Sequence, residues 1–195
     1  MSRKEQYTDD YSFDLPTCYE EGIIPVGRGI PVDLLDTDAD CGPSSLAAYL
    51  NISAAEAIGL LPLWKARRRH SSKRTLDALA SVGKPHVRIN LDGRIKSVRK
   101  VSNEYPAGFA EVRFLKRNRS EFSIRHIFAY DHNKYGKLMI YDNNATIDDI
   151  RGAWIAEDAW SSQILQWSQG FFHSPEPVAD YYLKHILVPY RHINS

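Results

Sequence analysis

Residues 38–50 read DADCGPSSLAAYL, so a cysteine stands directly before an apolar-periodic stretch. Pro43 suits the first turn of a helix, where its missing N–H costs nothing. Apolar residues then recur at helical spacing from Leu46 to Leu50. We therefore expect a helix from Pro43 to about Leu50, with Cys41 at its N-terminus. Unpaired N–H groups and the positive end of the helix dipole favour a thiolate at such a position.

A histidine and an aspartate further along the chain complete a candidate catalytic set. His126 lies in SIRHIFAYD (residues 123–131), and Asp142 follows in LMIYDNN (residues 138–144). Both stretches have strand character, and a turn-rich segment separates them. On neighbouring strands of a hairpin the two side chains can face the same side. Cys41, His126 and Asp142 would then be the nucleophile, the general base and acid, and the orienting group of a cysteine hydrolase.

Each of these residues also has a purely structural interpretation. Cys41 could be a small buried apolar residue, as free cysteines often are. His126 could be a hydrogen-bonded core histidine, and Asp142 could only cap the turn at residues 143–144. The sequence leaves these alternatives open.

The order of the motifs resembles that of a known family. Asp-Cys-Gly-Pro-x-x-Leu-Ala opens the helix, a histidine lies on one strand of a hairpin, and Tyr-Asp-Asn closes the next strand. This pattern resembles papain-like cysteine peptidases, and among them the bacteriocin-leader-processing peptidase domains and their stand-alone relatives. The resemblance covers Asp36 to Trp160. It implies a peptidase that cleaves a peptide or isopeptide bond through a Cys-His-Asp triad and an acyl-enzyme, with acyl transfer as a close variant.

The oxyanion hole is where the sequence departs from this pattern. The Cys41 backbone N–H can supply one donor. The resembled family places a glutamine six positions before the cysteine, but Leu35 stands there in this chain. The second donor would then come from Asn143, Asn144 or a backbone amide.

Three acidic residues precede the cysteine and are candidates for contact with substrate. An ionised carboxylate at Asp36, Asp38 or Asp40 would oppose an oxyanion, and those of Asp38 and Asp40 would also disfavour the thiolate. The same carboxylates could instead select a basic side chain of the substrate.

The order of expected elements places helices before strands, which indicates an α+β fold. For the resembled family this means N-terminal helices that carry the cysteine and an antiparallel sheet that carries the histidine and aspartate. A capping box at Ser53–Glu56 predicts a second helix, and Ser72 and Thr75 are candidate caps of a third. Strands are expected over 86–91, 107–116 (with Phe109, Val112 and Phe114 in the core), 124–131, 137–141 and 183–190, and helices over 146–151 and 157–169.

Length and composition fit one globular domain. The chain has 195 residues, 43% of them hydrophobic, and a net charge of +1. We expect an extended N-terminal arm over 1–35 and a papain-like domain over 36–195.

The start of the chain is polar and has no signal-like segment. We therefore expect a cytoplasmic protein, in the host cytoplasm if a phage encodes it.

The tryptophans Trp154, Trp160 and Trp167 fit no single helical stripe and are interpreted as core or groove-wall residues.

The expected partner is a protein or peptide substrate, without metal, cofactor or membrane, and the sequence does not define an oligomeric state. Two cysteines are too few for a disulfide framework or a structural zinc site. Two rival functions remain. One is a catalytically inactive binding protein on the same fold. The other is a nucleic-acid or acidic-partner binder that uses the basic run from Arg67, Arg68 and Arg69 to Arg74, although such runs are more often solvated helix faces.

Overall fold

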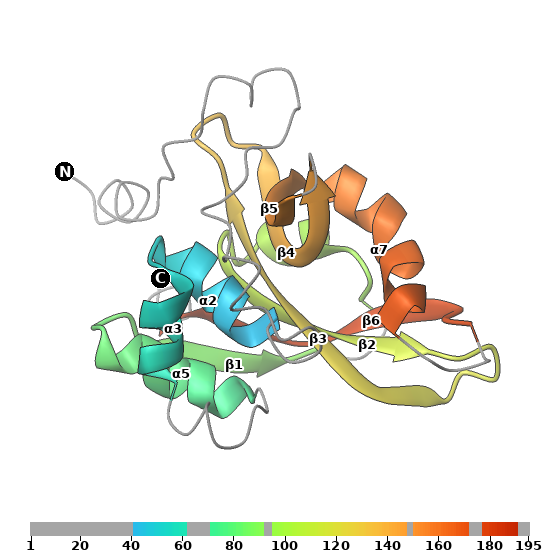
Figure 1. Cartoon of the computed structure of the whole chain (residues 1–195), viewed down its shortest axis with the longest axis horizontal. Coiled ribbons are helices and arrows are strands. Elements are labelled where there is room, and N and C mark those ends of the chain that lie inside the picture. Colours follow the sequence, from blue (N-terminus) through green and yellow to red (C-terminus); the bar gives the residue numbers. More distant parts are fainter. Residues whose placement is uncertain (1–40, 62–70, 92–94, 148–149, 172–176, 191–195) are drawn as a thin grey trace.

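The computed structural model describes residues 41–61, 71–91, 95–147, 150–171 and 177–190 (Figure 1). The expected arm over 1–35 lies outside these residues. The elements are, in chain order, α2 (Cys41–Leu50), α3 (Ala54–Leu60), α5 (Ser72–Ser81), β1 (His86–Asn90), α6 (Val98–Ser102), β2 (Gly108–Leu115), β3 (Glu121–His132), β4 (Leu138–Ile147), β5 (Ile150–Ala156), α7 (Glu157–Phe171) and β6 (Asp180–Pro189).

The strands form one six-stranded sheet in the order β1-β6-β2-β3-β4-β5. Every strand pairs antiparallel with its neighbours, and β6, the last strand of the chain, lies between β1 and β2. Helices and an antiparallel sheet together confirm the predicted α+β class. Among the described residues, none of the helices combines the length and the apolarity needed to cross a membrane.

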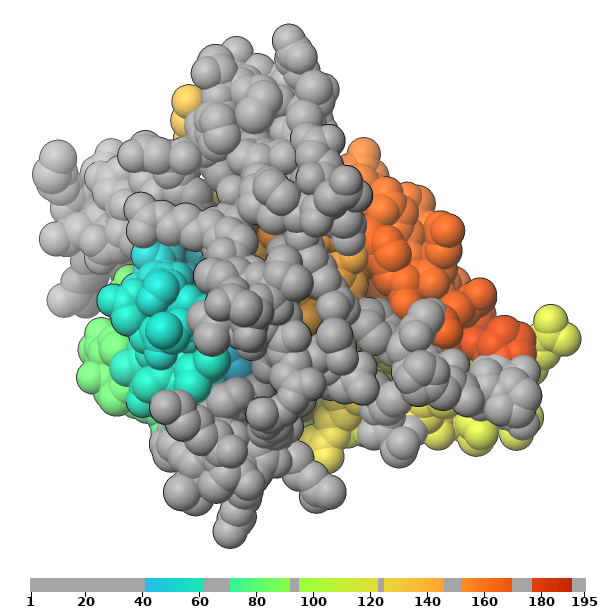
Figure 2. Space-filling view, in the orientation of Figure 1, coloured from blue at the N-terminus to red at the C-terminus, as the bar shows by residue number. Residues whose placement is uncertain are grey.

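Two apolar cores lie on the two faces of the sheet. Alternate residues of a strand point to opposite faces, so Phe109 packs with α2, α3 and α5, whereas Val112 and Phe114 pack with α6 and α7. All three side chains are buried, as the sequence predicted. Figure 1 and Figure 2 show α2 and α3 on one side of the molecule and α7 on the other.

The helix starts follow from local hydrogen bonds. The predicted capping box is present at α3, where Ser53 caps the helix and the Glu56 side chain binds the Ser53 N–H at 2.8 Å. The predicted caps of α5, Ser72 and Thr75, are both wrong. Ser71 is the cap, because its hydroxyl accepts from the Arg74 N–H, while the Ser72 hydroxyl is used in a contact with His185.

The predicted helix over 146–151 is wrong. Thr146 pairs with Arg151 and Ile147 with Ile150, so this segment ends β4 and begins β5. The pairing between the two strands supplies backbone hydrogen-bond partners from outside the segment, which outweighs local helix preference. The short helix α6 was not predicted.

β4 contains a wide bulge directly after Asp142. Asp142 pairs with Ala153 and the next registered pair is Thr146 with Arg151. β4 therefore has two more residues than β5 between these pairs, and the extra length re-aims the side chains that follow Asp142. On β5, Gly152 lies opposite the bulge with φ +86°, and a Cβ there would come within 2.7 Å of the Tyr141 hydroxyl.

Replacing Gly152 should therefore destabilise the fold. We expect Gly152→Ala to lower the free energy of unfolding by about 1–3 kcal/mol, because the positive φ and the Tyr141 contact both oppose a side chain. Gly59→Ala is the matched control, since nothing lies within 4 Å of a Cβ at that position in α3. Urea unfolding followed by circular dichroism measures both. Equal stabilities of the two variants would contradict this interpretation of the bulge.

Candidate active site

Cys41 is the first residue of α2 and is partly exposed. The helix begins two residues earlier than the sequence predicted. Other residues of α2 hold this helix against the sheet. Leu46 and Tyr49 are buried, and the Ser45 hydroxyl donates to the Ile127 carbonyl oxygen of β3 at 3.2 Å. The cysteine is thus placed at the start of a helix that is anchored to the strand carrying His126.

His126 and Asp142 lie where β3 and β4 part. The registered pairs of these strands run from His132↔Leu138 to Ala129↔Tyr141. Asp142 is one residue beyond the last pair and His126 is three residues beyond it. Their side chains still meet, with His126 Nε2 2.8 Å from Asp142 Oδ2. The structure therefore brings the two predicted residues together on one side of the hairpin.

Asp142 is held by donors from three elements. Its Oδ2 also accepts from Trp160 Nε1 of α7 at 2.8 Å, and its Oδ1 accepts from the Asn144 N–H at 2.9 Å. The side chain is 1% exposed. Burial alone would raise the pKa of Asp142, but the charge and hydrogen bond of His126, with the donors Trp160 and Asn144, lower it. Asp142 is therefore a fixed, ionised acceptor in an apolar setting.

His126 is buried and its charged form is favoured. Burial alone would lower its pKa, but the charge and hydrogen bond of Asp142, and then the hydrogen bond and charge of Cys41, raise that pKa to about 10. Cys41 is thus close enough to the ring to favour its charged form. Because Nε2 faces Asp142, Nδ1 is the nitrogen left for the thiol.

The asparagines after Asp142 lie in the bulge. Asn143 is 7% exposed, and its Oδ1 has no hydrogen-bond partner among the residues that the structure describes. Asn144 is half-buried, with Nδ2 3.5 Å from His126 Nε2. The Nδ2 amide of either side chain is the group that could donate to a substrate oxygen.

Several predicted residues lie outside the described part of the chain. These are Leu35, Asp36, Asp38 and Asp40 before the cysteine, and Arg67, Arg68 and Arg69 between α3 and α5. Their proposed contacts remain predictions. Across the ranges that are described, no group of three or more His, Cys, Asp or Glu side chains could hold a metal ion.

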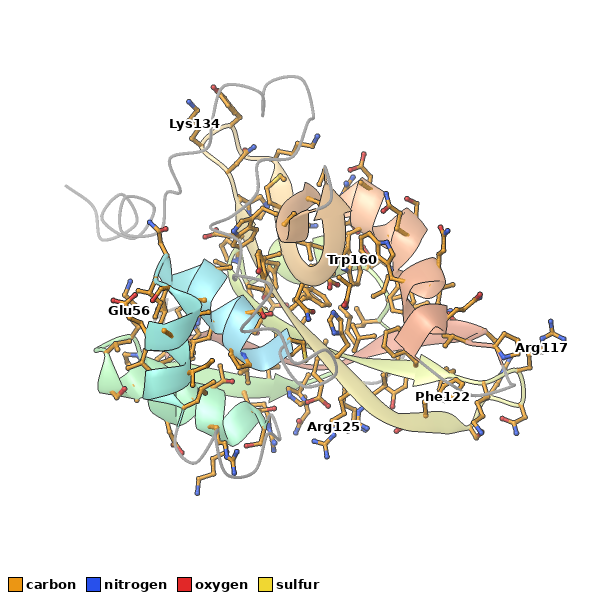
Figure 3. The ribbon with its side chains drawn as sticks, in the orientation of Figure 1. Glu56, Arg117, Phe122, Arg125, Lys134 and Trp160 are labelled. Atoms are coloured by element: carbon orange, nitrogen blue, oxygen red, sulfur yellow. The ribbon has the colours of Figure 1, made fainter. Side chains whose placement is uncertain are left out.

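Trp160 is the site residue that sequence reasoning missed. It was interpreted as a core or groove-wall residue, and it is fully buried against Phe128 with ring centroids 4.5 Å apart. Its indole N–H also donates to Asp142 Oδ2 at 2.8 Å. Figure 3 labels Trp160. The only available signal was general: a buried tryptophan usually finds an acceptor for its N–H.

Comparison with known proteins gives no family for this chain. No protein-family model matches it, and neither does any curated protein.

The His126–Asp142 pair predicts a specific pH dependence of stability. The pKa of His126 is raised above its ordinary value of 6.5, so the pair's contribution is full below about pH 6.5 and is lost as pH rises through the folded-state pKa. We use Cys41→Ala as the background, so that the slope reports the His126–Asp142 pair without the cysteine. Its free energy of unfolding should fall by up to about 1.4 kcal/mol per pH unit above pH 6.5.

Urea unfolding between pH 6.5 and 9 measures this slope. Above about pH 8, where the buried Asp131, whose pKa is raised to about 7, is also ionised, Cys41→Ala/His126→Gln should be nearly flat. Cys41→Ala/His132→Gln, which alters another histidine of β3, should keep the slope there. The same pH dependence in all three variants would show that His126 is not a charged partner of Asp142.

Proposed function

We propose that this protein is a papain-like cysteine peptidase that cleaves a peptide or isopeptide bond. The observation that carries the proposal is the 2.8 Å contact between His126 and Asp142, with Cys41 at the start of α2 also favouring the charged form of His126. A thiol at a helix start, a buried charged imidazole and an ionised carboxylate form the arrangement that activates a sulfur nucleophile.

The proposed reaction has two halves, acylation of Cys41 and hydrolysis of the acyl-enzyme, and His126 transfers a proton in each. The Cys41 thiolate attacks the carbonyl carbon and forms a C–S bond. As the tetrahedral intermediate collapses, the C–N bond breaks and the His126 imidazolium gives its proton to the leaving amine. His126 then takes a proton from water, whose oxygen attacks the thioester. Breaking the C–S bond releases the carboxylic acid product and restores Cys41.

Asp142 acts through His126 rather than on the substrate. Its bond to Nε2 keeps the ring in the tautomer and orientation that direct Nδ1 to the thiol, and its charge stabilises the imidazolium. The donors Trp160 and Asn144 hold the carboxylate in place. We regard both as positioning residues.

The oxyanion would form beside the start of α2. The Cys41 backbone N–H is the first proposed donor, and the side-chain amide of Asn143 or Asn144 is the candidate for the second. Losing one such donor typically costs on the order of 100-fold in rate. Transfer of the acyl group to an amine uses the same thioester and differs only in the acceptor.

A peptide-library digest tests the proposed activity. Wild-type protein should generate new peptide termini from a mixture of proteome-derived peptides, read by mass spectrometry, because the acyl-enzyme is hydrolysed. Cys41→Ala should abolish cleavage, whereas Cys18→Ala, which removes the other cysteine of the chain, should retain it.

The rival functions give different results in the same experiment. Cleavage that survives Cys41→Ala would exclude Cys41 as the nucleophile. Absence of cleavage by the wild type, with peptides retained on the protein, would favour the inactive binding protein.

A further inference from the structure

A strip of cationic side chains crosses the sheet on the face that carries α2 and α5. Arg125 of β3 pairs directly with Arg113 of β2. Lys184 of β6 and Arg88 of β1 continue the strip across the next two strands. Arg88, Arg125 and Lys184 are exposed, and the Arg113 side chain is 17% exposed.

A β-bulge in β6 puts Lys184 on this face. The register between β2 and β6 shifts between Glu111 and Val112. Lys184 Nζ lies 6.0 Å from the centre of the Tyr182 ring, and the next residue, His185, contacts Glu111 of the same face at 3.4 Å. Lys184 and His185, although consecutive, thus lie on the same face of the sheet, which a regular strand would not allow.

The strip has more positive than negative charge. Its carboxylates are Glu111, which binds Arg113 Nε at 3.1 Å, and Glu121, which lies 3.9 Å from Arg113 Nη1. Among the described residues, Arg88 and Arg125 make no ion pair. Burial and then the charges of the four cations lower the pKa of His185 to about 4. The four cations are therefore close enough to His185 that their positive charges add at that residue.

The strip lies on the face of the sheet that carries α2, the helix that begins at Cys41. Arg125 is two residues from Ile127 on the same face of β3, and the Ile127 carbonyl accepts from the Ser45 hydroxyl of α2 at 3.2 Å. His126, between them in sequence and paired with Val112, faces the other side of the sheet. The contact of Ser72 with His185 Nε2 at 2.6 Å brings the start of α5, including the exposed Lys73, to the region of the strip. Figure 3 shows Arg125 at the end of the molecule away from Lys134.

We propose that the strip formed by Arg88, Arg113, Arg125 and Lys184 binds a carboxylate-rich segment of the polypeptide substrate. This inference rests on the proposed peptidase function, which requires a polypeptide at Cys41. Four neighbouring strands span about 14 Å, the length of about four or five extended residues. Glu111 and Glu121 within the strip disfavour a continuous phosphate backbone, so a peptide fits better than a nucleic acid.

Binding of a short acidic peptide tests the strip. The probe is acetylated hexaglutamate with a neutral fluorophore, and fluorescence anisotropy is measured with Cys41→Ala so that no turnover occurs. We expect binding that weakens as salt rises. Arg88→Ala and Arg125→Ala, added singly, should each raise Kd about threefold, and together about tenfold.

Matched controls separate the strip from general electrostatics. Lys134→Ala removes a lysine at the β3–β4 turn and should leave Kd within about 1.5-fold. Hexalysine and a Gly-Ser hexapeptide with the same fluorophore should not bind. Equal losses with Lys134→Ala and Arg125→Ala, no binding of hexaglutamate, or tighter binding of hexathymidylate would overturn the proposal.

The binding assay and the reactivity of Cys41 are measured separately, so failure of the strip and failure of the proposed function give different results. If hexaglutamate does not bind but the reactivity of Cys41 still depends on His126, only the proposed substrate class is refuted. Specific hexaglutamate binding by a protein whose Cys41 is unreactive would support the strip as a binding surface and refute its role in catalysis.

Discussion

The buried contact between Asp142 and His126 is the interaction on which the candidate site depends. An isolated imidazole at this depth would be neutral, because burial disfavours the charged ring. Asp142 reverses that preference from 2.8 Å away. Its own charge is maintained because it accepts from Trp160 and the Asn144 N–H as well. A charged ring can therefore exist beside Cys41 inside the protein.

The sheet makes this contact possible by being irregular at one place. Regular pairing of β3 and β4 stops at Ala129↔Tyr141, and the bulge in β4 begins at Asp142. The start of α2 can then approach His126 where the strands part. Gly152 on β5 permits the bulge, since a side chain there would meet Tyr141. The candidate site and the main departure from ideal strand geometry thus coincide, as is common for bulges near functional sites.

Local patterns predicted much of this structure. The helix at Cys41, the capping box of α3 and the hairpin that joins His126 to Asp142 each depend on residues close in sequence. These features need only turn chemistry, capping and periodicity.

The features that the sequence did not predict depend on contacts between residues far apart in the chain. The segment 146–151 is strand because β5 pairs with it, and nothing local distinguishes that outcome from a helix. Trp160 reaches Asp142 from a helix 18 residues further along the chain. The basic strip assembles from β1, β2, β3 and β6 through a bulge that no local pattern marks. In each case the partner is chosen by the packed fold, which a single sequence does not reveal.

The central claim is that His126 activates Cys41, and the pH dependence of Cys41 alkylation tests it most directly. Iodoacetamide labelling, read by peptide mass so that Cys18 is scored separately, should be fast and nearly constant between about pH 6 and 8. His126→Ala should slow it at pH 6 by about tenfold or more, while His132→Ala should not. Labelling that rises only near the ordinary thiol pKa of about 8.5, unchanged by His126→Ala, would contradict the account and identify Cys41 as a structural cysteine.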